Sequence, residues 1–271
     1  MTIVIKYGGN AMTNKTVQKQ VLESIAKLFR SGIEVVLVHG GGPAIKEILD
    51  QSGISFRFED GHRVTDAVTM SFVEMALSGT VNKALVSGLL SFDCKAVGIS
   101  GKDAGMALVE KRYHKRILPD GRTETVDIGF VGNAPEITPD LIRLLLNNGF
   151  LPVCSPVSIG KNDGETYNVN ADVFAGSMAG ALQADAYVVL TDIDGLRKDI
   201  NNPGSLLSSV SLGELDEDSS FIQGGMIPKI DSCRHALQSG ARRAVILNGT
   251  KQNSLEDFFI HKKSFGTQIL P

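Results

Sequence analysis

Two lysines and three glycine-rich turns are the residues of this sequence whose types and spacing suit chemistry on a phosphate group. The turns are KYGGNAM (6–12), HGGGP (39–43) and QGGMIPK (223–229). Glycine lets a backbone approach a ligand closely and lets successive N–H groups converge on an anion. One such turn alone indicates only a tight connection. Three of them, two beside Lys6 and Lys229, favour an anion-binding site.

Neither of the two familiar glycine fingerprints is present. A dinucleotide-binding site has GxGxxG or GxGxxA, whereas the frame that begins at Gly40 reads GGGPAI. A phosphate-binding P-loop has GxxxxGK[ST], whereas the segment around Lys102 reads AVGISGKD. The positive charge for a bound anion must therefore come from lysines elsewhere in the chain.

Both lysines stand where a ligand would meet them. Lys6 comes at the end of an apolar, strand-like run, and the carboxyl ends of strands in an α/β sheet overlook the ligand-binding crevice. Lys229 follows Pro228, which suits the first turn of a helix. A cation there is disfavoured by about 0.3–1 kcal/mol, because the helix dipole is positive at that end. A bound anion would reverse that cost, whereas the alternative is an ordinary solvated lysine.

The segment YNVNADVFAG (167–176) supplies a carboxylate and an amide. Asn168 and Asp172 are four residues apart, so they would share a helical face if the helix begins early enough. The alternative is structural, with Asn170 as the helix cap and Asp172 complementing the dipole. Downstream, LTDIDGLRKD (190–199) ends a strand in two acids and a glycine, which suits either a nucleotide pocket or a polar turn.

Alternating strand and helix patterns must position these groups. The strand-like runs are TIVIK, IEVVLV, LPVCSPV, ADAYVVLTD and ARRAVIL, and the helical patterns between them include one with Val17, Val21, Ile25 and Leu28 on one stripe and Gly32 at its end. This alternation predicts an α/β fold with a parallel sheet and helices on its faces. ALVEKRYH and RTETVDIG, separated by LPDG, predict an antiparallel hairpin.

Composition limits the function. A chain of 271 residues can bury a sizeable core, as one large domain or two modest ones. The net charge of −3 gives no electrostatic reason to expect nucleic acid or an anionic membrane as a partner. Three widely spaced cysteines indicate neither a disulfide framework nor a metal pair. The absence of a signal-peptide pattern and of a long apolar stretch predicts a cytoplasmic protein.

Taken in order, the motifs resemble those of the amino acid kinase family. They are KYGGNAM, HGGGP, DGHRVTD (60–66), GTVNK (79–83), GISGKD (98–103), DIGFVG (127–132), YNVNAD (167–172), LTDIDGL (190–196), GGMIPK (224–229) and GTQI (266–269). Each is weak alone, but the ordered set covers almost the whole chain. The resemblance implies a three-layer α/β/α sandwich around a mainly parallel sheet, with two closely packed lobes. Residues 1–182 would bind the acyl substrate and dimerise, and residues 183–271 would bind ATP.

The resemblance also implies roles for individual residues. Lys6 and Lys229 would stabilise the transferring phosphoryl group, and Asp172 would orient both lysines. The substrate-binding residues would be Gly8, Gly9, Gly40, Gly41, Arg63 and Asn168, with Arg63 on the α-carboxylate. The ATP-binding residues would be Asp192, Ile193, Asp194, Gly195, Leu196, Arg197, Phe221, Ile222, Gln223 and Met226. No metal-binding side chain is implied, because Mg²⁺ would be held mainly by the phosphates of ATP.

Within the family, HRVTD and GTVNK favour the branch that phosphorylates the γ-carboxylate of N-acetyl-L-glutamate, the second step of arginine biosynthesis. This chemistry agrees with the residue types, because bringing two anions together needs positioning and charge neutralisation. A carboxylate acceptor needs no general base, so no histidine is required, and His39 is interpreted as part of its turn.

Two alternatives remain open from the sequence. One is a non-catalytic sensor of nucleotides or amino acids on the same fold, which would be expected to have lost Lys6, Lys229 or Asp172. The other is a kinase for a related small acid such as carbamate or carrier-linked aminoadipate. Because the sequence starts at its first strand, we expect an arginine-insensitive homodimer, although Tyr7 in KYGGNAM also resembles the arginine-sensitive branch. We expect no nucleic-acid or membrane partner.

Overall fold

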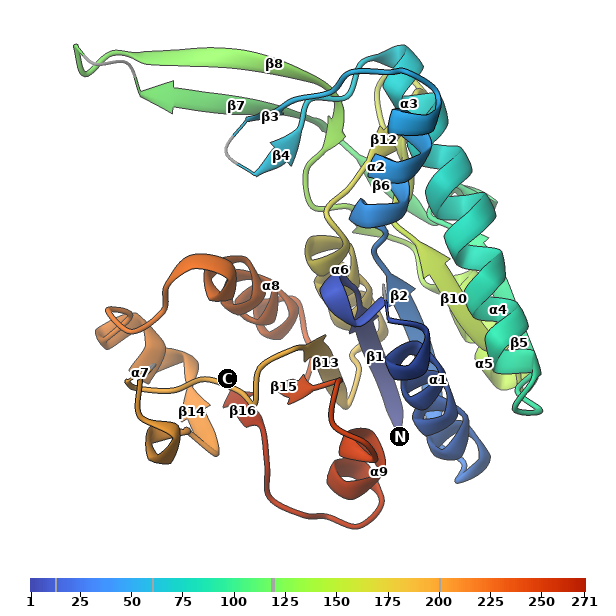
Figure 1. Ribbon diagram of the computed structural model, residues 1–271, viewed down its shortest axis with the longest axis vertical. Helices are drawn as coiled ribbons and strands as arrows, with labels where there is room; N and C mark the ends of the chain where they lie inside the picture. The colour runs from blue at the N-terminus through green and yellow to red at the C-terminus, as the bar shows by residue number, and fades with distance from the viewer. Residues whose placement is uncertain (13, 60, 118–119, 200) are drawn as a thin grey trace.

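A central sheet organises the molecule (Figure 1). The computed structural model describes residues 1–271 except 13, 60, 118–119 and 200, and except the side chains of residues 10 and 11. The eight described strands of the sheet lie in the order β14 (Ser209–Ser211), β16 (Thr267–Leu270), β15 (Ala244–Asn248), β13 (Ala186–Thr191), β1 (Thr2–Tyr7), β2 (Glu34–His39), β10 (Leu151–Ser155) and β5 (Ala96–Ser100). Neighbouring strands are parallel except β15 and β16, which confirms the predicted fold class.

Helices cover both faces of this sheet, because side chains alternate along each buried strand. Ile3 and Ile5 of β1 pack with α1 (Lys15–Arg30), α4 (Asn82–Leu90) and α9 (Ser254–Phe259). Val4 packs on the other side with α5 (Asp140–Asn147), α6 (Ala171–Leu182) and α8 (Ile227–Gln238). The three-layer sandwich is therefore confirmed. Lys6 has the same parity as Val4, so its side chain emerges on the side of α6 and α8.

The first helix follows its predicted pattern. In α1, Val21, Ile25 and Leu28 are buried, and the helix ends before Gly32, whose φ of +85° is the left-handed conformation expected there. Asn14 caps the amino end by accepting hydrogen bonds from the N–H groups of Thr16 and Val17. Local sequence signals therefore determine both ends of this helix.

A second, smaller sheet carries the hairpin. Its strands lie in the order β7 (Lys111–Ile117), β8 (Thr123–Gly132), β12 (Thr166–Asn168), β11 (Val157–Gly160), β6 (Ala107–Val109) and β9 (Glu136–Ile137). β7 and β8 form the predicted hairpin, with residues 118–119 of its turn outside the described part. The prediction was wrong for Ala107–Val109, which pairs with β11 and β9 instead of β8. This segment is largely buried whereas β7 is polar, so the two cannot continue as one strand.

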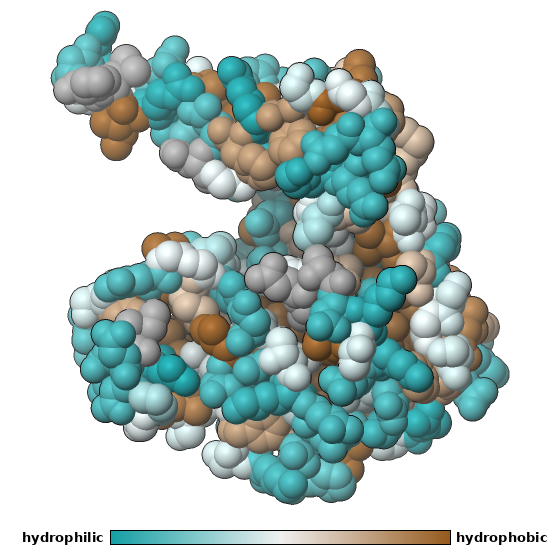
Figure 2. All heavy atoms as spheres, in the orientation of Figure 1, coloured by the Kyte–Doolittle hydropathy of each residue, from teal (hydrophilic) through white to brown (hydrophobic). Residues whose placement is uncertain are grey.

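The remaining elements complete the two ends of the molecule. α2 (Gly42–Gln51), α3 (Ala67–Glu74) and the π-helical stretch Met75–Val81 pack around a third apolar cluster, near the short hairpin of β3 (Phe58–Glu59) and β4 (His62–Arg63). α7 (Leu212–Glu217) lies in the carboxyl-terminal part. Figure 2 shows a hollow between the projecting β7–β8 hairpin and that part. The predicted lobe boundary at 182/183 falls between α6 and β13 and stays a prediction.

Two further sequence expectations concern cysteines and membranes. Cys94, Cys154 and Cys233 are free and buried, as expected for cysteines that only pack in the core. Among the described residues, every helix is too short or too polar to span a bilayer.

Candidate active site

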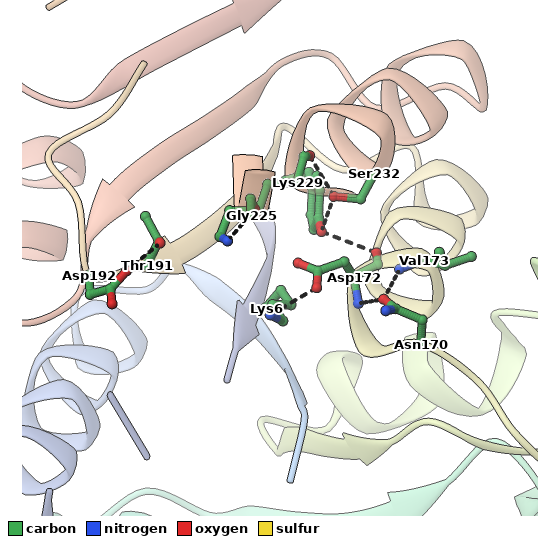
Figure 3. Close-up of polar contacts among 10 residues, drawn as sticks. Lys6, Asn170, Asp172, Val173, Thr191, Asp192, Gly225, Lys229 and Ser232 are labelled. Atoms are coloured by element: carbon green, nitrogen blue, oxygen red, sulfur yellow. Dashed lines mark hydrogen bonds and ion pairs between the residues drawn. The ribbon is translucent and has the colours of Figure 1, made fainter. Parts of the chain in front are cut away.

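An ion pair between Lys6 and Asp172 forms the centre of the candidate site (Figure 3). Lys6 Nζ lies 3.0 Å from Asp172 Oδ2, and only 11% and 14% of the two side chains are exposed. Asp172 is in the first turn of α6, where Asn170 caps the helix by accepting from the N–H groups of Asp172 and Val173. Asp172 Oδ1 is buried and has no hydrogen-bond partner among the described residues. The carboxylate therefore keeps one acceptor for a further cation.

Lys229 lies in the first turn of α8 and directs its amino group to Gly225, as Figure 3 shows. Its Nζ donates to the carbonyl oxygen of Gly225 over 2.7 Å. Within the described residues, Asp172 thus pairs with Lys6, whereas Lys229 is held by its own turn. Asp172 thus contacts the first lysine and not the second, and its predicted orienting role stays a prediction.

Tyr187 links the two helices that carry these groups. Its hydroxyl lies 3.2 Å from the carbonyl oxygen of Asp172 and 3.1 Å from Ser232 Oγ, within donor reach of both. Ser232 Oγ in turn donates to the carbonyl oxygen of Lys229 over 2.7 Å. Burial raises the pKa of Tyr187 well above its usual value, so the phenol remains a donor. This buried contact keeps the start of α8 beside the start of α6, and sequence reasoning missed it.

The first two glycine-rich turns meet beside Lys6. A Cβ placed on Gly8 would lie 3.1 Å from Lys6 Nζ and 3.7 Å from the backbone nitrogen of Gly40. Gly9 has a φ of +71°, which glycine adopts most easily. The N–H of Gly40 donates to the carbonyl oxygen of Tyr7 over 2.9 Å, so it is not available to a substrate, contrary to the prediction.

The N–H of Gly41 has no backbone hydrogen-bond partner among the described residues. It is the N-cap of α2, where the backbone N–H groups carry the positive end of the helix dipole. A Cβ on Gly41 would lie 2.6 Å from Leu77 Cδ2, so close packing also requires a glycine.

Arg63 is buried with one edge of its guanidinium unsatisfied. The side chain lies against two nearly perpendicular rings, with Cζ 4.2 Å from the centroid of Phe56 and 4.7 Å from that of Phe58. Its Nη1 is buried without a hydrogen-bond partner among the described residues. Desolvation lowers the pKa of Arg63, although a guanidinium stays charged in proteins. A buried, unpaired guanidinium edge is suited to a carboxylate.

Asn168 comes from a strand. It is the last residue of β12 and pairs with Val157 and Val131 in the second sheet. The condition for a shared helical face with Asp172 is not met, because α6 begins at Ala171 with Asn170 as its cap. The structural alternative for Asn170 is thus confirmed, whereas substrate binding by Asn168 stays a prediction.

A cleft of about 490 Å³ lies beside the end of β13. Seven of the ten predicted ATP-binding residues line it: Ile193, Gly195, Leu196, Arg197, Phe221, Gln223 and Met226. Lys198, Asp199, Asn201 and Ser220 also line it and were missed, although Lys198 and Asp199 belong to the segment LTDIDGLRKD.

The other three predicted ATP-binding residues, Asp192, Ile222 and Asp194, do not line the cleft. Asp194 instead forms an ion pair with Lys251 at 2.7 Å and accepts from Asn248 over 2.8 Å, and these partners lower its pKa. In the part of the chain that the structure describes, no group of three or more His, Cys, Asp or Glu side chains is placed to hold a metal ion.

Comparison with known proteins gives a consistent family. The family model described as the amino acid kinase family matches residues 1–248. Acetylglutamate kinase from Pelotomaculum thermopropionicum is 43% identical over 270 residues, which covers 99% of this chain and 91% of that protein.

Solved structures show the same fold. N-acetylglutamate synthase from Neisseria gonorrhoeae, complexed with coenzyme A and N-acetyl-glutamate, has a TM-score of 0.78 at 24% identity. That match covers 100% of this chain, which spans 59% of the synthase chain. Carbamate kinase from Giardia has a TM-score of 0.71 at 21% identity, covering 99% of this chain and 98% of that one. With the family model matching most of its length, this chain belongs to the amino acid kinase family.

Proposed function

We propose that this chain transfers the γ-phosphoryl group of ATP to the γ-carboxylate of N-acetyl-L-glutamate, giving N-acetyl-γ-glutamyl phosphate and ADP in the second step of arginine biosynthesis. The 43% identity to an acetylglutamate kinase over nearly the whole chain supports this activity. The observation that carries the proposal is the buried guanidinium of Arg63, whose Nη1 lacks a partner among the described residues. A substrate with a second, non-reacting carboxylate satisfies that group.

Lys6 and Lys229 offset the repulsion between the two anions of this reaction. The acceptor carboxylate is already deprotonated at neutral pH, so the chain needs no general base. Positioning and charge neutralisation carry the rate enhancement instead. One lysine comes from β1 and the other from the first turn of α8, so the two charges reach the phosphoryl group from different elements.

Asp172 orients both lysines once ATP is bound. Its Oδ2 already holds Lys6 at 3.0 Å, and its Oδ1 is buried without a partner among the described residues. Lys229 donates to a neutral carbonyl at Gly225. Because an anionic phosphoryl group adds a Coulombic attraction that the neutral carbonyl lacks, the amino group exchanges Gly225 for the phosphoryl group.

ATP binds in the cleft beside β13 as its Mg²⁺ complex. A volume of about 490 Å³ is within the range of small-molecule sites. Ile193 and Phe221 offer apolar surface to the base, and Arg197 offers positive charge to the phosphates. Mg²⁺ enters with the phosphates and neutralises part of their charge.

Carbamate kinase activity is the second candidate, favoured by the shared fold with the Giardia enzyme. Carbamate has a single carboxylate, which would leave the buried edge of Arg63 without a partner, at a cost of about 1–3 kcal/mol or more. A non-catalytic sensor is disfavoured because Lys6, Lys229 and Asp172 are all present.

An acyl-phosphate trap with hydroxylamine tests the proposal. The purified chain is incubated with MgATP and, in separate reactions, N-acetyl-L-glutamate, L-glutamate, L-aspartate or carbamate. Among the three amino acids, we expect ATP-dependent hydroxamate with N-acetyl-L-glutamate only. We also expect ADP to be released in that reaction. No hydroxamate with N-acetyl-L-glutamate would rule the activity out, and ADP release with carbamate alone would favour the second candidate.

We also propose that the protein is a homodimer that acts in the cytoplasm, where ATP is supplied. Val68, Met75 and Leu90 are each more than half exposed along α3, the π-helical stretch and α4. Of these elements, α4 and the π-helical stretch lie beside β5, the edge strand of the central sheet. Burying such a face against a second copy is favourable. Light scattering should give twice the chain mass of 29.0 kDa, and a monomer would contradict the proposal.

A further inference from the structure

His39 is a fully buried histidine immediately before the glycine turn that reaches Lys6. Its Nδ1 lies 2.9 Å from the carbonyl oxygen of Gly40, and its Nε2 lies 3.1 Å from Asn82 Nδ2. Neither His39 nor Asn82 has a role in the reaction proposed above. His39 nevertheless contacts the backbone of the glycine turn directly, and Asn82 contacts His39.

The partners of His39 determine its tautomer. A carbonyl oxygen only accepts, so Nδ1 must carry the proton and donate to Gly40. Burial lowers the pKa of His39 to about 4, which leaves the ring neutral and Nε2 an acceptor at neutral pH. Asn82 Nδ2 then donates to Nε2, while Asn82 Oδ1 is buried without a partner among the described residues.

The orientation of Asn82 is determined independently. Its Nδ2 also donates to the carbonyl oxygen of Val153 over 2.9 Å, which a flipped amide could not do. Asn82 Oδ1 lies against Gly98. Any larger residue there would place its Cβ only 2.0 Å from that oxygen. The amide is therefore held by the backbone of the neighbouring strands of the sheet.

These contacts constrain the peptide between Gly40 and Gly41. The N–H of Gly40 is held by Tyr7 over 2.9 Å, and its carbonyl oxygen by His39 over 2.9 Å. In a trans peptide the carbonyl and the following N–H point in opposite directions. The N–H of Gly41 therefore points away from the buried ring, and it has no backbone partner among the described residues, while the preceding Gly40 lies against Gly8.

We propose that His39 is a positioning residue that holds the Gly41 N–H as a preorganised donor for the reacting anions, with Asn82 fixing its ring. This inference rests on the proposed function, because it assigns the donor to the phosphoryl group or the acceptor carboxylate. A donor fixed before the reaction needs no reorganisation as charge shifts, which is why oxyanion-type donors contribute strongly to rate.

Two amide variants of His39 test whether the reaction needs the N–H at the Nδ1 position or the imidazole ring itself. Asparagine places an N–H near the position of Nδ1, whereas glutamine places one near Nε2. We expect H39N to keep kcat in the hydroxamate assay within about fivefold, and H39Q to lower it by about 10²-fold, the lower end for loss of one such donor. The KM for ATP should change little in either. H235N and H235Q serve as controls, because His235 is half-buried and hydrogen-bonded to Ser177 in the contact between α6 and α8, not at the glycine turn.

The tautomer gives a second readout that does not depend on activity. Nitrogen-15 correlation spectra of the histidine rings, with the signal of His39 assigned by its loss in H39N, should show the proton on Nδ1 in the wild type. A proton on Nε2, or an equal loss of kcat in H39N and H39Q, would overturn the inference. Wild-type protein without hydroxamate formation would instead overturn the proposed function, and the spectrum would still report the His39 contact.

Discussion

At Arg63, two aromatic rings hold the guanidinium in place. Its Cζ lies 4.2 Å from the centroid of Phe56 and 4.7 Å from that of Phe58, and the two rings meet edge to face. Phe58 is 54% exposed, so it gains little from burial. Its position is better explained by the cation–π contact that fixes Arg63 in a dry environment.

Replacing Phe58 by leucine should therefore weaken binding of the acyl substrate. The loss of a cation–π contact of about 0.5–1 kcal/mol corresponds to a two- to fivefold higher KM for N-acetyl-L-glutamate. The kcat and the KM for ATP should remain unchanged, and F58Y should restore the wild-type KM. Tyr113→Leu is the control, since that ring is also 54% exposed but lies on the β7–β8 hairpin. An equal effect of both leucine variants would contradict the proposed role.

Lys229 should matter to rate far more than to stability. Its ordered contact in the described structure is a hydrogen bond to Gly225, so Lys229→Ala removes little from the folded state. In the reaction it supplies charge to the transferring group, and loss of such an electrostatic contact costs about 10²–10³ in kcat. Steady-state kinetics together with the thermal midpoint test this, and a variant that unfolds without losing rate would contradict it.

His39 also predicts a pH dependence of stability. Its pKa is lowered to about 4 in the folded chain, against about 6.5 in the unfolded chain. Between these values the unfolded state binds a proton that the folded state does not, so stability rises with pH and is lost as pH falls from 6.5 toward 4. The full contribution is about 3 kcal/mol at 1.36 kcal/mol per unit of pKa.

Urea unfolding of wild type and H39N across this pH range measures that contribution. Other groups that titrate here, including His235 and the carboxylates, are common to both proteins. We therefore expect the wild type to lose more stability than H39N on acidification. The same pH dependence in both proteins would show that His39 does not titrate in this window.

Among the elements, the contact between α6 and α8 sets the distance between Asp172 and Lys229. Two glycines on α6 allow this close approach. A Cβ on Gly176 would lie 2.9 Å from the carbonyl oxygen of Ser232, and one on Gly180 would lie 2.3 Å from Ser239 Cβ. Both contacts are shorter than real Cβ atoms tolerate, so the helices would have to separate.

Gly180→Ala should consequently destabilise the protein, although alanine is the better helix former by about 1 kcal/mol. Overpacking at a tight contact costs about 1–3 kcal/mol, which exceeds that gain. The free energy of unfolding in urea measures the difference. Gly213→Ala in α7 is the matched control, because its nearest contact would be 3.9 Å and stability should not fall. An increase in stability for Gly180→Ala would refute this account.

Local sequence signals predicted most of these elements. The apolar stripe of α1, the cap at Asn170 and the strand that ends near Lys6 depend on neighbouring residues, so they could be read from the sequence. The break between β6 and β7 could not, because Glu110 carries no turn signal and the two strands differ in their tertiary partners.

The site was predictable in its residue types but not in its contacts. Lys6 and Asp172 are 166 residues apart and no local pattern connects them. Only the resemblance to a family predicted that they act together. The capture of the Gly40 N–H by Tyr7 depends on the register between β1 and β2. The stacking of Phe56 and Phe58 on Arg63 has no periodic signature, so only the structure could show it.

For the whole molecule, the continuous central sheet connects two separate binding regions. β1 pairs with β2 on one side and with β13 on the other, so Lys6 stands between the glycine turn and the start of the nucleotide cleft. Arg63 belongs to the hairpin at the other side of the hollow seen in Figure 2. We infer that the acyl substrate and the nucleotide bind to different parts of one fold and meet at Lys6.

Ligand-induced stabilisation tests this separation. A ligand at 100 times its Kd stabilises the folded state by about 2.7 kcal/mol, which raises the thermal midpoint by several degrees. We expect N-acetyl-L-glutamate and a non-hydrolysable ATP analogue each to give such a shift. Arg197→Ala should reduce the shift from the nucleotide alone, because Arg197 lines the cleft, and Phe58→Leu should reduce the shift from the acyl substrate alone. If either variant reduced both shifts equally, the two ligands would share one region and the division proposed here would be wrong.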